Sequence, residues 1–281
     1  MKAAPISVII PAHNEEEFLA QAIRSVHAQT LQPTEIIVIA DACTDRTPQI
    51  AADLGAIVWE QKRRNMAAGL NLGIKQSSQP WIALLDADDV WDRRKLALQW
   101  KAIQSFPAAA LVSCDLSILV EDKLTPFPRR YLRERWHDID HLTLKPFYHY
   151  LEKVPGRFLP RFNMQTTTVL LRRDVFSTTG LFDEKLIYGQ TLEFFARLVA
   201  RYPMVYVERS LVNHRRHDHN HTHASRLAEF WPMLLSIVDH MLKNPNQYPE
   251  GTGEAYRERM KEQFIHAERF LARDRSSLIV S

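Results

Sequence analysis

The chain up to residue 120 alternates short apolar runs with amphipathic stretches. The apolar runs, several of them rich in β-branched residues, predict strands at residues 6–10, 35–40, 56–59, 81–85 and 109–120. Apolar residues at helical spacing predict helices over residues 18–29, 47–55, 64–75 and 92–106. This alternation is typical of βαβ units around a parallel sheet, so we expect an α/β fold.

Local signals predict where the first two helices begin and end. Asn14 followed by Glu17 resembles a capping box. Thr47 followed by Pro48 resembles an N-cap residue with proline at the first helical position, and Gly55 suits the position after the helix end. The strands at residues 6–10 and 35–40 are therefore each expected to lead into the next helix through a short polar loop.

Beyond residue 120 the pattern loosens, and residues 121–162 are rich in proline, aromatic and basic side chains. The regular elements that we expect further on are strands at 166–171 and 204–207, a helix at 191–201 and two apolar helical stripes at 227–242 and 256–271. We therefore expect one domain over residues 1–224, followed by a C-terminal helical extension over residues 225–281.

Polar side chains follow three of the predicted strands. Asn14 follows the first, Asp41 the second, and Asp86, Asp88 and Asp89 the fourth. In open α/β sheets, ligands bind at the carboxyl ends of the strands. Three carboxylates this close together repel one another, so the cluster indicates a hard divalent cation such as Mg²⁺ or Mn²⁺. An acidic helix start, favoured by the helix dipole, is the alternative interpretation.

The segment after the second strand offers hydrogen-bonding groups with two interpretations. Asp41 is suited to accept a hydrogen bond from a base or a ribose. Thr44, Asp45 and Thr47 are better suited to cap the helix that follows. The segment therefore combines one candidate ligand-binding residue with residues that start a helix.

Three familiar motifs are absent from the sequence: the phosphate loop GxxxxGK[ST], the dinucleotide fingerprint GxGxxG and the nucleophile elbow GxSxG. A P-loop ATPase and a standard dinucleotide-binding protein are therefore disfavoured. A lipase-like hydrolase is disfavoured for the same reason.

The composition narrows the function mainly by exclusion. Of the 281 residues, 46% are hydrophobic and 25% are charged, which is ordinary for a globular protein. The net charge of +3 gives no indication of nucleic-acid binding. The two cysteines, Cys43 and Cys114, exclude a disulfide framework and a four-cysteine zinc site, and they fit a reducing cytoplasm. No apolar run approaches the roughly 20 residues of a membrane span, so we expect no membrane-spanning helix, and no secretory signal is visible in the first residues given.

Six segments, taken in this order, resemble motifs of the family-two glycosyltransferases, which have the GT-A fold. They are VIIPAHNE at 8–15, IIVIADACTDRT at 36–47, NLGI at 71–74, LDADD at 85–89, GLFDE at 180–184 and VNHRRH at 212–217. The resemblance covers roughly residues 5–223. It implies a Rossmann-like, mostly parallel mixed sheet with helices on both faces. It also implies a nucleotide-sugar-binding half at residues 1–120 and an acceptor half at residues 121–224.

The resemblance implies two groups of functional residues in this chain. The implied nucleotide-binding residues are Pro11, Ala12, Glu15, Asp41, Asn71, Asp86 and Asp88. The implied metal-binding residues are Asp88, Asp89 and His217, with Mn²⁺ or Mg²⁺ as the metal. A divalent cation would stabilise the charge that the nucleoside diphosphate gains as the glycosidic bond breaks. Asp41 would face the base, which makes a UDP-sugar the first expectation for the donor.

Two departures from the family pattern lie in the donor half. Ala40 precedes Asp41 where the family usually has two aspartates, so one carboxylate is lost. Leu70 stands where the family has an arginine. Lys62, Arg63 or Arg64 would then supply the positive charge nearby.

The largest departure concerns the general base. Gln190 and Thr191 stand where the family has a Glu-Asp pair, and neither can act as a base near neutral pH. One explanation is that Glu193 is the catalytic base. Two residues correspond to roughly 200° around a helix, however, and an ordinary surface or capping carboxylate is the alternative. A second explanation is a phosphate or carboxylate acceptor that is already ionised. A third is a catalytically impaired protein that binds a nucleotide sugar as a sensor or partner subunit.

Three later segments bear on the acceptor and the partners. Residues 123–161 carry nine basic and four acidic side chains, a local balance of +5, which suits an anionic acceptor or a lipid surface, although a solvated loop is the alternative. Of the clustered histidines at 214–223, only His217 matches a family position, and the others are interpreted as mobile loop residues. The C-terminal stripes suit helices packed on the domain, with a peripheral membrane contact or a homodimer contact as the alternative.

We therefore expect a metal-dependent, inverting glycosyltransferase of cell-envelope polysaccharide biosynthesis, cytoplasmic or peripheral to the inner face of the membrane. The expected acceptor is a saccharide, a lipid-linked molecule or a phosphate-bearing molecule, and not a nucleic acid. A nucleotidyltransferase is disfavoured because residues 11–14 contain no glycine-rich phosphate loop.

Overall fold

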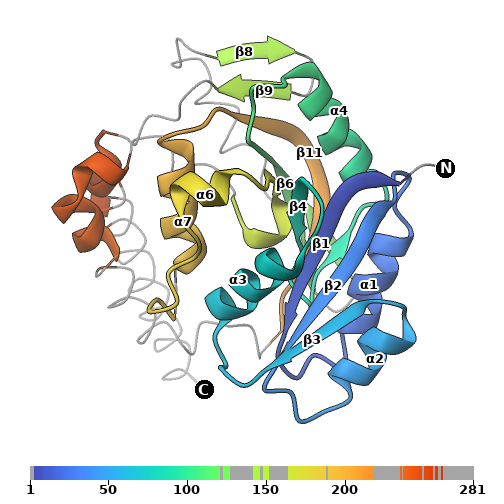
Figure 1. The fold of residues 1–281 in the computed structure, drawn as a ribbon. Helices are drawn as coiled ribbons and strands as arrows, with labels where there is room; N and C mark the ends of the chain where they lie inside the picture. Colours follow the sequence, from blue (N-terminus) through green and yellow to red (C-terminus); the bar gives the residue numbers. More distant parts are fainter. Residues whose placement is uncertain are drawn as a thin grey trace, which may run out of the picture.

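Strand β1 (Ala4–Ala12) lies within one curved sheet in a computed structural model of the chain (Figure 1). The structure describes residues 3–120, 123–126, 142–145, 148–151, 164–187, 189–217, 235, 237–248, 250–255, 257, 258 and 261. Within these residues, the sheet has the strand order β3-β2-β1-β4-β10-β6-β11-β9-β8, with β5 paired to β11 and β7 paired to β6. The other strands are β2 (Pro33–Asp41), β3 (Ile57–Gln61), β4 (Trp81–Leu84), β5 (Val90–Trp91), β6 (Leu111–Val120), β7 (Lys123–Pro126), β8 (Leu142–Lys145), β9 (Tyr148–Leu151), β10 (Leu170–Arg172) and β11 (Met204–Arg215).

The four strands β3, β2, β1 and β4 are parallel, so their carboxyl ends meet at one edge of the sheet. Strand β10 enters antiparallel between β4 and β6, with Arg172 opposite Trp81 at the amino end of β4. Strand β11 runs parallel to β6 and ends at the same edge as β4. The carboxyl ends of β1, β2, β4 and β11 therefore surround one region, which is where the predicted site residues fall.

Helices cover both faces of the sheet, as the resemblance implied (Figure 1). The helices are α1 (Leu19–His27), α2 (Thr47–Asp53), α3 (Met66–Gln76), α4 (Lys95–Ser105), α6 (Val175–Thr179) and α7 (Gln190–Val199). Buried residues of α1, α2 and α4 pack against one face, and those of α3, α6 and α7 pack against the other. Along β1, Ile9 joins the α3 side while Val8 and Ile10 join the α1 side. Alternate side chains of a strand point to opposite faces of the sheet. Because both faces are covered by helices, nearly every residue of these strands is apolar.

Helix α3 lies close to β1 because glycine occupies the contact position. A Cβ atom added at Gly73 would lie 2.3 Å from Ile9 Cγ2. Such a distance is far inside van der Waals contact, so this crossing requires glycine.

Several predicted element boundaries are wrong. Asn14 does not cap α1, which begins at Leu19; instead its Oδ1 accepts from the N–H of Thr44 at 2.8 Å. Thr47 does not cap α2, since its hydroxyl accepts from the N–H of Glu15 at 2.7 Å. The capping prediction is confirmed for Asp45, whose Oδ1 accepts from the N–H of Thr47 at the start of α2 at 3.0 Å.

Other differences concern short elements. Residues 166–168 form a 3-10 turn rather than the start of a strand, and β10 begins at Leu170. Strand β11 continues to Arg215, well past the predicted end at residue 207. Strand β5 and helix α6 were not predicted, because elements of two and five residues show no usable periodicity.

The described C-terminal residues pack on the α7 side of the sheet. Ile237, Val238, Met241 and Tyr248 are buried in the same core cluster as α3 and α7. This confirms helices packed on the domain for this part, while residues 225–234 and most of the stripe at 256–271 lie outside the described residues. None of the helices in the described ranges has the length and hydrophobicity of a membrane span. The predicted domain boundaries at 120 and 224 stay predictions.

Candidate active site

Carboxylates from two strand ends gather at the carboxyl edge. Glu15 follows β1, and Asp86, Asp88 and Asp89 follow β4. Burial and the charge of Asp88 raise the pKa of Glu15 to about 8. Burial and the charge of Asp89 also raise the pKa values of Asp86 and Asp88. The folded chain therefore favours the protonated forms of these carboxyl groups and stabilises their negative charge poorly by itself.

This cluster fits a divalent cation on two observations. The Oδ1 atom of Asp86 is buried and accepts no hydrogen bond from the residues that the structure describes. The raised pKa values mean that a cation would favour the ionised forms. The described residues hold no preformed group of three or more metal-ligating side chains. A Mg²⁺ or Mn²⁺ ion here would therefore rely on one or two carboxylates together with phosphate oxygens and water, which is common for nucleotide-bound Mg²⁺.

His217, which was predicted to bind the metal, lies beside this cluster. Its Nε2 is 3.1 Å from Asp88 Oδ2. Its ring also lies against Phe18, with ring centroids 4.7 Å apart. The structure thus brings His217 and Asp88 together, which leaves the imidazole close to any phosphate or metal bound at Asp88.

The end of β11 holds the carboxylate loop from the other side. His214 Nδ1 is 3.1 Å from Asp89 Oδ1, and the N–H of Arg215 donates to the same oxygen at 2.9 Å. The Nε of Arg215 donates to the carbonyl of Asp88 at 3.0 Å. Asp89 is fully buried, and these contacts give its carboxylate hydrogen-bond partners within the protein. Its predicted metal-binding role stays a prediction.

The interpretation of His214 as a mobile loop residue is wrong, because it belongs to β11. Arg215 was not predicted as a site residue. The apolar and polar positions of residues 211–215 were the available signal, since they continue the strand beyond residue 207. The other clustered histidines, His219, His221 and His223, lie outside the described residues.

The predicted nucleotide pocket lies at the ends of β1 and β2. Pro11 and Ala12 are the last residues of β1 and pair with Ile39 and Ala40 of β2. Asp41 is the last residue of β2. The ring of His13 lies here too, with Nδ1 2.6 Å from the carbonyl oxygen of Asp41. The structure therefore brings Pro11, Ala12 and Asp41 together.

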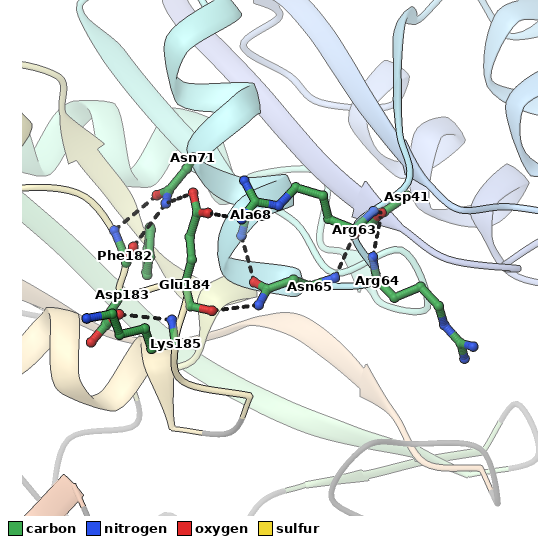
Figure 2. A network of polar contacts seen from close by, with 10 residues as sticks. All are labelled: Asp41, Arg63, Arg64, Asn65, Ala68, Asn71, Phe182, Asp183, Glu184 and Lys185. Atoms are coloured by element: carbon green, nitrogen blue, oxygen red, sulfur yellow. Dashed lines mark hydrogen bonds and ion pairs between the residues drawn. The ribbon is translucent and has the colours of Figure 1, made fainter.

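Asp41 holds the loop that leads into α3. Its Oδ1 accepts from the N–H groups of Arg63 and Arg64, each at 2.8 Å, and its Oδ2 accepts from the N–H of Asn65 at 2.7 Å (Figure 2). Burial opposes ionisation, but these hydrogen bonds outweigh it and lower the pKa of Asp41. The predicted contact of Asp41 with a base stays a prediction, and the structure adds a role in shaping the loop.

The same loop reaches the GLFDE segment at residues 180–184. Asn65 Nδ2 donates to the carbonyl of Glu184 at 2.8 Å, and Arg63 forms a 2.7 Å ion pair with the Glu184 carboxylate (Figure 2). Asn71, predicted to bind nucleotide, is buried and donates to Glu184 Oε1 at 3.0 Å. The network thus connects helix α3 and the loop before it to the turn at residues 182–184.

Of the three cations expected to replace an arginine at position 70, Arg63 is committed to Glu184. Leu70 itself is fully buried in the core. Figure 2 shows the Arg64 guanidinium directed away from the network. Among the described residues, neither Lys62 nor Arg64 has an ion-pair partner, which leaves these two cations of the loop available for a ligand there.

Gln190 and Thr191 stand where the resemblance places the family's general base. Gln190 is buried at the start of α7, where its Nε2 lies 3.2 Å from Met66 Sδ. Its Oε1 has no hydrogen-bond partner among the described parts of the chain. Thr191 follows it. A carboxylate beside the thioether would lack a partner, which is consistent with the neutral amide at this position.

Glu193 is not the surface carboxylate offered as an alternative, because its side chain is buried in the first turn of α7. Its oxygens accept from Arg197 Nε at 2.5 Å and Arg197 Nη2 at 2.8 Å. The hydroxyl of Tyr248 donates to Glu193 Oε1 at 2.9 Å. Arg197 also donates to the carbonyls of Thr179 and Leu181. The predicted catalytic role of Glu193 stays a prediction, but these contacts occupy both of its oxygens.

The basic acceptor segment falls largely outside the described residues. This applies to Arg129, Arg130, Arg133, Arg135, Lys153, Arg157 and Arg161.

Comparison with known sequences gives a clear match. The sequence model of "Glycosyl transferase family 2" matches residues 7–180, more than half of the chain. An uncharacterized glycosyltransferase of Rickettsia typhi is 26% identical over 247 residues, covering 85% of this chain and 73% of that protein. The low-salt glycan biosynthesis hexosyltransferase Agl6 of Haloferax volcanii is 38% identical over 96 residues, covering 34% of this chain and 23% of that protein.

Solved structures match at the level of the fold. S. aureus TarS 1–349 in complex with UDP-GlcNAc gives a TM-score of 0.63 at 16% identity, covering 84% of this chain and 66% of TarS 1–349. The mannosyltransferase PcManGT of Pyrobaculum calidifontis, in complex with GDP-Man and Mn²⁺, gives a TM-score of 0.61 at 17% identity. That match covers 91% of this chain and 70% of PcManGT. These likenesses confirm the GT-A fold.

Proposed function

The chain belongs to glycosyl transferase family 2, and from this premise we propose that it transfers a sugar from a nucleoside-diphosphate sugar with the help of Mn²⁺ or Mg²⁺. The observation that carries the metal proposal is the group of Glu15, Asp86 and Asp88 with raised pKa values at the carboxyl edge of the sheet. A bound divalent cation would stabilise the charge that develops on the leaving diphosphate.

The residues of this chain have distinct tasks in the proposed reaction. Pro11, Ala12 and Asp41 position the nucleotide at the ends of β1 and β2. Asp86 and Asp88 hold the metal with the diphosphate, with His217 next to Asp88. Asn71 acts through the turn at 182–184, which it fixes. We keep a UDP-sugar as the first donor to test and add a GDP-sugar, because TarS is solved with UDP-GlcNAc and PcManGT with GDP-Man.

We infer an inverting reaction on a saccharide, a lipid-linked molecule or a phosphate-bearing acceptor. An acceptor that is already ionised would need no base, which would suit the neutral pair Gln190 and Thr191. A role in cell-envelope polysaccharide synthesis, a cytoplasmic location with contact to the inner membrane face, and a homodimer complete the proposal.

The absence of an ionisable side chain at Gln190 and Thr191 also supports a second candidate function. A chain with Gln190 and Thr191 in place of a base would serve as a nucleotide-sugar sensor or partner subunit. The two functions share the donor site and differ only in turnover. Purified chain that binds a donor but never releases nucleoside diphosphate would favour the second.

Calorimetric titration tests the donor site directly. UDP, GDP and dTDP are each titrated with Mn²⁺ and again with EDTA. We expect one nucleotide to bind in the presence of the metal, and Asp88→Ala to abolish that binding without unfolding the chain. Absence of binding for all three nucleotides, or full sugar transfer by Asp88→Ala, would contradict the proposal.

A further inference from the structure

The turn at residues 182–184 is fixed from two directions. Asn71 of α3 binds both the N–H and the carbonyl of Phe182, and Asn65 binds the carbonyl of Glu184 (Figure 2). From the other side, Arg197 of α7 donates to the carbonyl of Leu181 at 2.9 Å. The backbone on each side of Asp183 is therefore held by side chains that are far away in the sequence.

Asp183 is the side chain of this turn that the network leaves exposed. Its Oδ1 accepts from the N–H of Lys185 at 2.9 Å, which orients the carboxylate. Within the described residues, its Oδ2 makes no hydrogen bond or ion pair. Figure 2 shows Asp183 turned toward Lys185 while Glu184 reaches Asn71 and Arg63. A carboxylate on a fixed backbone, with one oxygen oriented and one open, is preorganised to meet a substrate group.

The other carboxylates in the described residues from 164 to 217 are engaged or lie elsewhere. Glu184 and Glu193 are ion-paired. Asp174 follows β10 at the amino edge of the sheet, opposite to the donor site, and is also ion-paired. Glu208 lies in the middle of β11. Asp183 therefore stands out among them as an exposed carboxylate on the turn that is tied to the donor half.

We propose that Asp183 is the general base of this enzyme, taking the role that Gln190 and Thr191 cannot fill; this inference rests on the proposed function. The open oxygen of Asp183 removes the proton from the acceptor hydroxyl. The acceptor oxygen then forms a bond to the anomeric carbon of the donor sugar. The bond between that carbon and the diphosphate oxygen breaks, and its electron pair leaves with the nucleoside diphosphate.

The test compares the full chain with Asp183→Asn, which keeps an oxygen for the N–H of Lys185 but cannot accept a proton. UDP-GlcNAc and GDP-mannose are each supplied with Mn²⁺ and a panel of monosaccharide acceptors. In a parallel reaction without any monosaccharide, water is the acceptor. Released nucleoside diphosphate is measured against pH. We expect Asp183→Asn to lower kcat by about 100-fold or more and to abolish the acidic limb of the pH profile. The donor KM and the nucleotide Kd stay within about twofold.

Two further variants sharpen the result. Asp183→Glu is expected to retain part of kcat together with the acidic limb. Asp174→Asn makes the same chemical change at the opposite edge and is expected to leave kcat unchanged. Circular dichroism confirms the fold of each.

The proposal is overturned if Asp183→Asn raises the donor KM while kcat and the pH profile stay unchanged, since the carboxylate would then only bind the donor sugar. It is also overturned if Asp183→Asn keeps full kcat. If the unmodified chain binds no nucleotide at all, the proposed function fails first, and calorimetry separates that outcome from a failure at Asp183.

Discussion

The side-chain amide of Asn71 forms both hydrogen bonds of a backbone pair with Phe182. Asn71 Oδ1 accepts from the N–H of Phe182 at 3.0 Å, and Asn71 Nδ2 donates to its carbonyl at 2.9 Å. Both residues are buried. A single side chain of α3 thus serves the turn as a neighbouring strand would, and it binds a segment 111 positions further along the chain.

Asn71→Ala should destabilise the protein and disturb the turn. It leaves the N–H and the carbonyl of Phe182 buried without partners, each at a cost of about 1–3 kcal/mol. Chemical unfolding by urea measures the loss. Asn65→Ala serves as a comparison, because it removes a contact with the same turn at a less buried site. Equal stability of Asn71→Ala and the unmodified chain would contradict this role.

Glu193→Leu should lower the free energy of unfolding by about 3–5 kcal/mol, because it leaves the partly buried guanidinium of Arg197 without its counter-charge. The double variant Glu193→Leu with Arg197→Met should lose less free energy of unfolding than the sum of the losses in the two single variants. Urea unfolding of the four proteins gives the coupling energy. Additive losses within about 0.5 kcal/mol would show that the pair is not coupled.

Glu193→Gln distinguishes the structural role of Glu193 from catalysis. If Glu193 holds α7 in place, stability falls and any loss of kcat follows the loss of folded protein. A base would show the reverse pattern, with kcat lowered by about 100-fold or more at unchanged stability. Released nucleoside diphosphate and thermal unfolding are measured on the same samples.

The metal-free protein should become less stable as pH rises from about 4.5 to about 8. Burial and Asp88 raise the pKa of Glu15 from its ordinary 4.5 to about 8, so the folded chain binds a proton that the unfolded chain releases. The contribution of this group to stability is present below pH 4.5 and is lost as pH rises through about 8. Urea unfolding at several pH values in EDTA measures the slope. Glu15→Gln should flatten it, and an unchanged slope in that variant would contradict the assignment.

Gly73→Ala should destabilise the protein by about 1–3 kcal/mol through overpacking. The added Cβ meets Ile9 Cγ2 at 2.3 Å, so α3 must move away from β1. Thermal unfolding measures the effect. Combining the change with Ile9→Ala removes the clashing atom, so the double variant should lose less than the sum of the single changes. Wild-type stability of Gly73→Ala would mean that α3 can shift freely.

The parts of the fold that could be predicted from the sequence are those with a continuous physical pattern. The runs that became β1, β2 and β4 are buried on both faces, and their apolar residues are therefore consecutive. The carboxylates after β4 could be located because a strand end in a parallel sheet is a ligand site in general.

The parts that could not be predicted depend on contacts between distant segments. The pairing of Asn71 with Phe182 leaves no trace in either local pattern. The capping box at Asn14 failed because Thr44, 30 residues later, competes for the same side-chain oxygen. Strand β11 was predicted too short because its polar residues at the end, such as His214, face the carboxylate loop rather than solvent.

The contact between β11 and the carboxylate loop has a consequence for the order of folding. His214 binds Asp89 across 125 positions of the chain, so a nascent polypeptide exposes its carboxylates long before their partners have been synthesised. Contacts of such long sequence separation form late and slowly, because the intervening loop must close first. The donor edge is therefore completed only after residue 217 has left the ribosome, and nucleotide binding by a growing chain would mark the moment at which the whole sheet has assembled.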